Sequence, residues 1–156
     1  MATKMAMSRA LTLVVALIVA LATQAQAAKW RYCDGDWEAR IEDATVVPDP
    51  ARAGKEINVI INGEIGRLVE GGDLDLTVLF HSIPVYKETD NLCDRLDSCP
   101  AKGDFVVDAK QKLPSFTLPG LYQLKIQAKD TGGKSLVCMM LDLEIKGPSF
   151  SEYFAS

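Results

Sequence analysis

Alternation of apolar and polar residues is the feature of this sequence that most limits the folds open to it. Every second side chain is apolar in the four clearest stretches, which are Glu56–Asn62, Asp73–Phe80, Leu121–Lys129 and Val137–Lys146. Successive side chains of a strand point to opposite faces, so this period of two is typical of antiparallel strands that are buried on one face. Weaker candidates are Trp37–Val47, Ile83–Glu88 and Phe105–Ala109. About seven antiparallel strands are therefore predicted, and no segment sustains the period of a helix.

Prolines and glycines separate these stretches at short intervals. They fall at Pro48–Pro50, Gly71-Gly72, Pro119-Gly120 and Asp130–Gly133, and the last of these is predicted to close a hairpin. We interpret Gly63–Gly66 as a further turn, which would end the strand that begins at Glu56. Short strands at turn-marked spacing predict an all-β fold, specifically an immunoglobulin-like β-sandwich.

The start of the chain has the pattern of a secretory signal peptide. Lys4 and Arg9 precede the apolar run Leu11–Ala22, and Ala25-Gln26-Ala27 fits the small-x-small cleavage pattern. A membrane anchor is the alternative, but the run is shorter than the ~20 residues that span a bilayer. We therefore expect a signal peptide over 1–27, one domain over 28–147 and a flexible tail over 148–156. The expected destination is the extracellular space or a vacuolar or lysosome-like lumen.

Four cysteines follow the leader, and an even number in a secreted chain predicts two disulfides with three possible connectivities. Cys93 and Cys99 flank a short polar loop, which makes their local pairing easy. That pairing leaves Cys33 to join Cys138 and to tie the two ends of the domain together. A metal site is disfavoured because the chain has a single histidine, His81, and no CxxC pair.

Charge and motifs argue against several classes of function. Removal of the leader takes away two of the 17 basic residues, so the net charge changes from −4 to −6. An acidic domain of this kind with scattered lysines disfavours a nucleic-acid partner and a strong attraction to anionic membranes. The sequence has no nucleophile elbow, phosphate loop or dinucleotide fingerprint, and His81 is expected at the surface or in a turn. We therefore predict a protein that is not an enzyme and that uses neither a metal nor a cofactor.

Three segments together resemble a known family. They are Trp30–Gly35 with Val47–Pro50 and Gly54-Lys55, then Asp90–Cys93 with Cys99–Phe105, and finally Leu113–Tyr122 running into Cys138. The cysteine spacing, the CP-x-x-GDF run and the LP-x-F-T-x-PG-x-Y run are specific in combination. Over about Lys29 to Lys146 the chain is similar to the ML (lipid-recognition) domain family. It looks closest to the plant Niemann-Pick type C-like sterol carriers, also labelled phosphatidylglycerol/phosphatidylinositol transfer proteins.

The resemblance implies a sandwich with sheets splayed at one end, holding a sterol or acyl chains between them. It also implies the pairs Cys33–Cys138 and Cys93–Cys99. Relatives with six cysteines have a further bridge in an early loop, which this chain lacks, so a looser entry near the second strand is expected. Ala101 stands where the family usually has a bulky aliphatic residue, which affects the shape of the pocket. Alternation by itself is also compatible with a solid core.

The expected wall of the lipid cavity consists of apolar residues on the inner faces of the strands and in the loops beside them. They are Val59, Ile61, Leu76, Val78, Phe80, Val85, Phe105, Phe116, Leu118, Tyr122, Leu124, Ile126 and Met139. Plain core packing is the alternative for each of them. Tyr122 is expected to offer its phenol to a sterol hydroxyl or a phosphate at the rim. Lys87 and Lys102 are weaker candidates for contact with a headgroup, while Trp30 and Trp37 are expected to be structural anchors.

Two functional hypotheses follow from these expectations. The first is a monomeric, secreted carrier that binds a sterol or a phospholipid, contacts membranes transiently and shields the lipid from water. Exposure of apolar surface costs about 25 cal/mol per Å², so a dry pocket makes transport through water feasible. The alternative is a protein-binding sandwich that acts as a lipid-sensing or receptor co-factor in defence signalling. A buried apolar cavity favours the carrier, whereas a large exposed apolar patch on an edge strand favours the protein binder.

Overall fold

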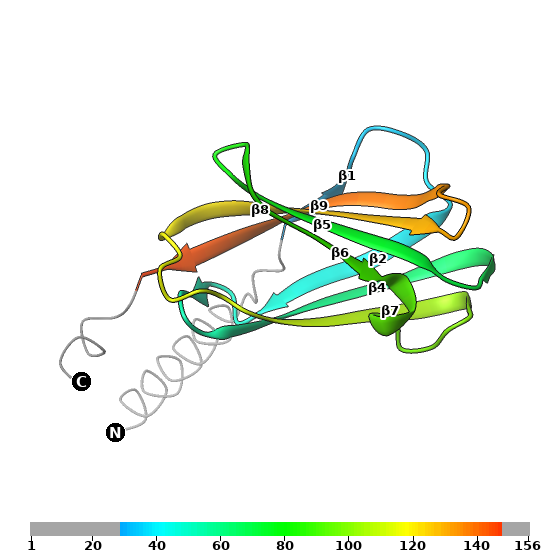
Figure 1. Ribbon diagram of the computed structural model, residues 1–156, viewed down its shortest axis with the longest axis horizontal. Helices are drawn as coiled ribbons and strands as arrows, with labels where there is room; N and C mark the ends of the chain where they lie inside the picture. The colour runs from blue at the N-terminus through cyan, green and yellow to red at the C-terminus, as the bar shows by residue number, and fades with distance from the viewer. Residues whose placement is uncertain (1–28, 148–156) are drawn as a thin grey trace, which may run out of the picture.

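Two β-sheets packed face to face form the structure of residues 29–147, the part of the chain that the computed structural model describes (Figure 1). The larger sheet has the order β1-β9-β8-β5-β6, with β3 paired to β9, and the smaller has the order β2-β4-β7. The strands of the larger sheet are β1 (Trp30–Tyr32), β3 (Ala51–Arg52), β5 (Gly72–Phe80), β6 (Ile83–Asn91), β8 (Gly120–Asp130) and β9 (Ser135–Lys146). Those of the smaller are β2 (Ala39–Val47), β4 (Glu56–Val69) and β7 (Ala101–Lys112). The predicted sandwich is confirmed, with nine strands instead of about seven, whereas the expected signal peptide and tail lie outside the described residues.

The clearest sequence patterns correspond to the central strands of the larger sheet. On β8, Tyr122, Leu124 and Ile126 are buried between the sheets, and Lys125 on the opposite face is exposed. All neighbouring strands pair antiparallel except β3 and β9, which run parallel over two residues. The alternation therefore identified the strands that form the core.

Strand β4 corrects the interpretation of Gly63–Gly66 as a turn. The strand runs through these residues to Val69, and Gly63 pairs with Phe105 of β7. A Cβ atom on Gly63 would lie 2.7 Å from Cζ of the Phe105 ring and 2.6 Å from the carbonyl oxygen of Arg40. Glycine is present here because the backbone and an aromatic ring approach it closely, and not because the chain turns.

Helical structure in residues 29–147 is limited to one 3₁₀ turn, Leu92–Asp94, called η1 in the element order. The Asn91 side chain caps it, since its Oδ1 accepts a hydrogen bond of 2.9 Å from the backbone N–H of Cys93. No helix in this part of the chain is long and apolar enough to cross a membrane.

Both predicted disulfides are confirmed. The Cys33–Cys138 disulfide joins two residues that are 105 positions apart in the chain. The Cys93–Cys99 disulfide closes the loop between β6 and β7. Trp37 lies at the first of these bridges, because its indole N–H donates to the Cys33 carbonyl at 3.1 Å.

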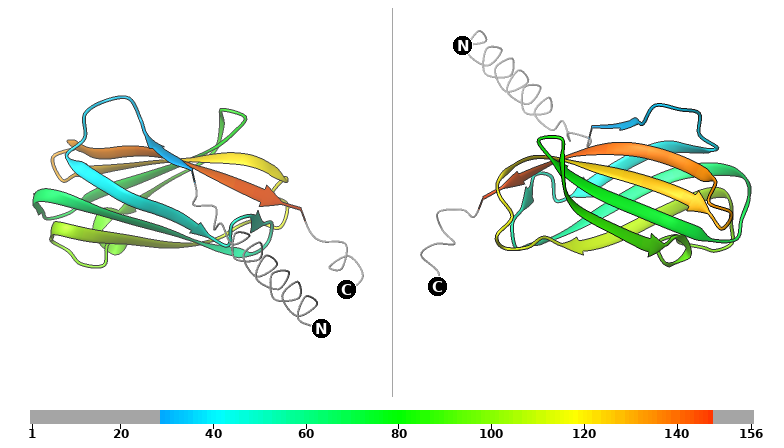
Figure 2. Two further views of the ribbon diagram at one scale, coloured as in Figure 1. Left: turned by 180° about the vertical axis from the view of Figure 1, so that it is seen from behind. Right: turned by 45° about the horizontal axis from the view of Figure 1, so that its top comes forward.

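The two ends of the sandwich differ in their loops. One end, called here the disulfide-loop end, carries the Cys93–Cys99 loop, the β4–β5 turn and the β8–β9 hairpin. The opposite end carries the β5–β6 hairpin, which projects from the body of the sheet, and the loop from β7 to β8 (Figures 1 and 2). His81 and Ser82 form the tip of this hairpin, so the histidine is a turn residue as expected.

Candidate functional site

A cavity of about 50 Å³ lies between the two sheets at the disulfide-loop end. All of its wall residues are apolar, and they come from both sheets and from the loop after β6. They are Ala39, Ile41, Ile61, Ile65, Val69, Leu74, Leu92, Leu96, Ala101, Phe105, Val107, Ile126, Ala128, Leu136 and Val137. No polar or charged residue of the described chain is buried in the core around it. A wall of this kind offers dispersion contacts but no hydrogen bonds, so it suits a hydrocarbon group.

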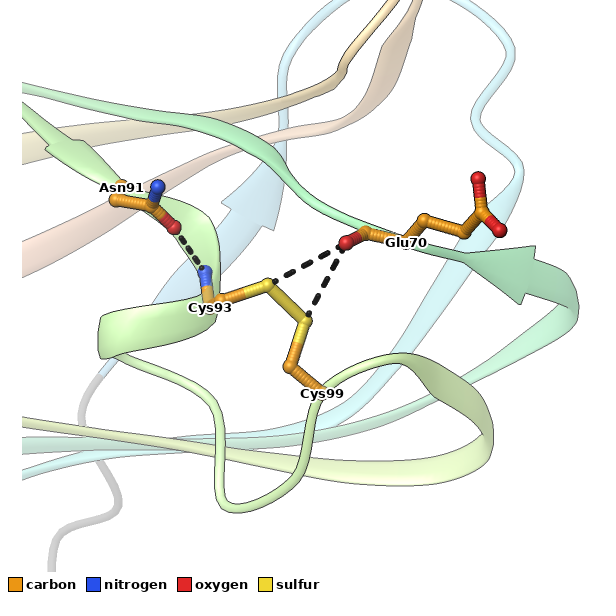
Figure 3. Close-up of a disulfide and its surroundings, with 4 residues drawn as sticks. All are labelled: Glu70, Asn91, Cys93 and Cys99. Atoms are coloured by element: carbon orange, nitrogen blue, oxygen red, sulfur yellow. Dashed lines mark hydrogen bonds between the residues drawn. A yellow bond between two sulfur atoms is a disulfide. The ribbon is translucent and has the colours of Figure 1, made fainter.

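The Cys93–Cys99 loop covers the cavity at this end. Leu92 and Leu96 point their side chains into the wall, and an isolated bridge between Leu96 and Val107 holds the loop against β7. Both sulfur atoms of the disulfide lie near the Glu70 carbonyl oxygen, at 3.7 and 3.9 Å, so the loop also contacts the β4–β5 turn (Figure 3). The disulfide therefore positions two wall residues.

Four charged residues, called here the ionic clasp, join the two sheets beside the cavity. They are Glu38, Arg67, Asp130 and Lys134. Nε of Arg67 on β4 lies 2.6 Å from Oε2 of Glu38, and its Nη2 lies 2.5 Å from Oδ2 of Asp130 at the end of β8. Lys134 also pairs with Glu38. These contacts connect the smaller sheet to the β8–β9 hairpin of the larger one.

The contacts of the clasp shift the pKa values of Glu38, Asp130 and Arg67. Hydrogen bonds from Lys134 and then Arg67 lower the pKa of Glu38 below its ordinary value, and a hydrogen bond from Arg67 lowers that of Asp130. The same pairs raise the pKa of Arg67. Glu38 and Asp130 are therefore charged at neutral and mildly acidic pH.

The thirteen residues expected to form the wall divide into four groups in the structure. Ile61, Phe105 and Ile126 line the cavity. Four others are buried between the sheets beyond it, namely Val59, Tyr122, Leu124 and Met139. Three are partly buried against the core, namely Leu76, Val78 and Phe80. Three are exposed at the end opposite the cavity, namely Val85, Phe116 and Leu118.

Most of the observed wall residues were not among those expected from the sequence. Leu74, Val107, Ala128 and Val137 follow the same alternation as the expected residues, so their inward direction was readable, but their position along the sandwich was not. Ile65 was obscured by the interpretation of its segment as a turn. The loop residues Leu92 and Leu96 lack any periodic signal, and only the disulfide next to them marks their importance.

The three residues that were expected to contact the polar part of a lipid lie in different environments. The Tyr122 hydroxyl donates to the Leu118 carbonyl at 2.9 Å, and burial raises the pKa of this phenol. Tyr122 therefore fixes the β7–β8 loop on β8. Lys87 and Lys102 are exposed on β6 and β7.

The size of the cavity sets a condition on any ligand. Pockets that enclose a small molecule usually measure ~300–1,000 Å³, which is several times the volume found here. A sterol or an acyl chain therefore requires the sheets to move apart or core side chains to change rotamer.

Comparison with known proteins gives a family match. The sequence profile of the ML domain matches residues 27–145. A putative phosphatidylglycerol/phosphatidylinositol transfer protein of Dictyostelium discoideum is 27% identical over 126 residues, which cover 75% of this chain and 85% of that protein. A phosphatidylglycerol/phosphatidylinositol transfer protein of Aspergillus fumigatus is 29% identical over 114 residues, which cover 69% of this chain and 65% of that protein.

A solved structure has the same fold. A Niemann-Pick type C2 protein from the Japanese carpenter ant superposes with a TM-score of 0.60 over 76% of this chain and 99% of its own length, at 15% sequence identity. At this identity the similarity concerns the arrangement of the strands and not the ligand.

Proposed function

Because the chain belongs to the ML domain family, we propose that it binds a sterol or a phospholipid between its two sheets and carries it through water. The observation that carries this proposal is the cavity with an entirely apolar wall between the sheets. The names of the relatives in Dictyostelium and Aspergillus support a phospholipid such as phosphatidylglycerol or phosphatidylinositol.

The inner face of β8 supplies the path for the hydrocarbon chain. Tyr122, Leu124, Ile126 and Ala128 are buried along it, and Ile126 and Ala128 reach the cavity. A strand rises about 3.3 Å per residue, so this row spans roughly 20 Å. That length accommodates most of an acyl chain or a sterol, with the polar headgroup at the end opposite the cavity.

The edge between β6 and β7 is the place where the sheets separate in this proposal. At the disulfide-loop end this edge is held, because Arg95 of the loop pairs with Asp90 on β6 at 2.6 Å and its carbonyl accepts from Asp108 of β7. On the opposite edge, the Tyr32 hydroxyl of β1 accepts a hydrogen bond of 2.6 Å from the backbone N–H of Ile41 on β2. Between Ile83–Lys87 and Ala109–Lys112 the described structure has no such tie. Separation of this stretch therefore breaks no hydrogen bond or ion pair between the two strands in the described part of the chain, whereas the disulfide-loop end of the edge stays held.

In this proposal the chain acts as a monomer, without metal or catalytic chemistry, in the extracellular space or in a vacuolar or lysosome-like lumen. Two disulfides support an oxidising compartment. Within residues 29–147 no group of three or more metal-ligating side chains occurs.

The test starts from the full chain secreted by a eukaryotic host. Lipids extracted from the purified protein are identified by mass spectrometry, and displacement of a fluorescent sterol and a fluorescent phospholipid is measured in solution. We expect one lipid class to co-purify and one probe to bind at micromolar protein. If no lipid co-purifies and neither probe binds, the carrier function is wrong.

A further inference from the structure

We propose that the end of the sandwich opposite the cavity is a docking surface for an anionic lipid bilayer. This inference rests on the proposed function, because a carrier must meet a membrane to load and release its lipid. Beyond that function, the inference names the residues that contact the membrane and the membrane charge that they select.

Five large apolar side chains, called here the apolar tip, are exposed at this end. They are Ile83, Val85, Phe116, Leu118 and Leu121. Phe116 is 84% exposed, Leu121 71% and Ile83 64%. Soluble monomers rarely expose several such residues at one end, because each adds apolar surface to water. The apolar tip is therefore expected to be covered by a partner.

Contacts at the base of the apolar tip connect its two segments. Phe80, which precedes the β5–β6 hairpin and pairs with Ile83, has its ring 4.7 Å from that of Tyr122, measured between centroids. The hydroxyl of Tyr122 holds the carbonyl of Leu118. A Cβ atom on Gly120 would lie 2.9 Å from the Phe80 ring, so the start of β8 also packs closely against this base. The β5–β6 hairpin and the β7–β8 loop are therefore held together, as one surface requires.

Basic side chains lie beside the apolar tip. Arg52, Lys112 and Lys146 are exposed, and none of them forms an ion pair with another residue in 29–147. The backbone places them together, because Arg52 pairs with Lys146 in the β3–β9 ladder and Lys112 ends β7 just before the loop. Hydrogen bonds from Gly54 to Pro114, at 3.2 Å, and from Leu113 to Lys55, at 2.9 Å, tie the segment after β3 to this loop.

The opposite end of the sandwich has the reverse charge. Nine acidic residues lie in the loops and strand ends at the disulfide-loop end, namely Asp34, Asp36, Glu38, Glu70, Asp73, Asp94, Asp97, Asp104 and Asp130, and only Glu38 and Asp130 among them are paired in the ionic clasp. A chain with a net charge of −4 over its whole length thus carries Arg52, Lys112 and Lys146 next to its exposed apolar residues, with Glu56 opposite Lys112 in the β4–β7 ladder. This separation orients the protein with the apolar tip toward a negative surface.

An anionic bilayer fits both the apolar tip and the cations beside it, whereas a second copy of the chain does not. A symmetric dimer through the apolar tip would bring two sets of unpaired cations together. A bilayer accepts the apolar side chains at its interface, and its anionic headgroups attract the cations around them. Each lysine near such a surface contributes about fivefold to binding.

The experiment measures binding of the secreted protein to two kinds of vesicle by sedimentation. One contains phosphatidylcholine alone, and the other contains about one third phosphatidylserine. We expect binding to the anionic vesicles at low salt and a decrease as salt increases. The double variant F116S/L118S should lower binding roughly tenfold. K112E/K146E should abolish the preference for phosphatidylserine.

Matched controls come from the disulfide-loop end. Leu68→Ser removes an apolar residue that is 49% exposed on β4, and Lys102→Glu reverses an exposed charge on β7. Both should bind vesicles like the unchanged protein. Equal binding to the two vesicle types, or equal losses in the control and tip variants, would overturn the proposal.

Two further measurements separate this surface from its alternatives. Binding of a soluble fluorescent lipid without vesicles reports the cavity, and F116S/L118S should retain it. Loss of vesicle binding with intact probe binding supports the docking surface, whereas loss of both overturns a separate surface. Sedimentation velocity tests for a dimer, and a dimer that F116S/L118S dissociates would show that the apolar tip binds a second copy instead.

Discussion

Arg67 pairs with both carboxylates of the ionic clasp, so the stability that it contributes should depend on pH. Glu38 and Asp130 have pKa values below their ordinary ones in the folded protein, because of hydrogen bonds from Lys134 and Arg67 to the first and from Arg67 to the second. Carboxylates of this kind stabilise the fold above the pKa of the unfolded chain, and the stabilisation is lost as pH falls through the folded pKa. The clasp should therefore stay closed at the pH of a lysosome-like lumen and weaken only in stronger acid.

Arg67→Met tests this at the residue scale. Thermal unfolding followed from pH 7 to strongly acidic pH should show a constant difference from the unchanged protein down to about pH 5. The difference should then shrink and disappear once both carboxyl groups are protonated. Arg31→Met is the matched control, because it removes one contact of 3.5 Å to Asp142 and should have a much smaller effect. A difference that persists in strong acid would mean that the ion pairs of Arg67 are not its cause.

Among the elements, the packing of β4 depends on Gly63, and Gly66 in the same strand offers a control. Gly63→Ala places a methyl group against the Phe105 ring and the Arg40 carbonyl, and overpacking of this kind costs about 1–3 kcal/mol. A methyl group on Gly66 would meet no atom within 4 Å, so Gly66→Ala should change stability by less than about 0.5 kcal/mol. Urea unfolding of the two variants measures the difference. Similar losses in both would show that strand flexibility matters here, and not the close approach of Phe105.

The same strand explains what the sequence could and could not predict about the elements. Alternation predicted β5, β8 and β9 because each strand carries at least four inward-facing apolar residues at every second position. It did not predict β1 and β3, because two or three residues are too few to show a period. The sequence pattern placed the end of β4 too early, because a glycine that makes room for an aromatic ring cannot be distinguished in the sequence from a glycine in a turn. The cavity depends on how far the two sheets diverge, and that distance is set by contacts between residues far apart in the chain.

At the scale of the whole molecule, the apolar cavity is small and the sheets must open to admit a lipid. A substitution that fills the cavity should therefore raise the stability of the lipid-free protein and weaken lipid binding. Ala101 is 3% exposed and lines the cavity. Ala101→Val adds two methyl groups to a space of about 50 Å³. Substitutions that fill a cavity commonly raise stability by about 0.5–2 kcal/mol. The lipid-free form should gain this stability, and the lipid should then have to displace the added groups.

Ala109→Val provides the comparison, because Ala109 lies on the inner side of the same strand but outside the cavity wall. Unfolding of the delipidated protein should show a higher midpoint for Ala101→Val, and displacement of the fluorescent lipid should show weaker binding for that variant only. A ligand that binds only the folded protein raises its apparent stability in proportion to the logarithm of its concentration. The unchanged protein should therefore gain more stability from added lipid than Ala101→Val. Equal gains would mean that the bound lipid never reaches the disulfide-loop end and stops along β8.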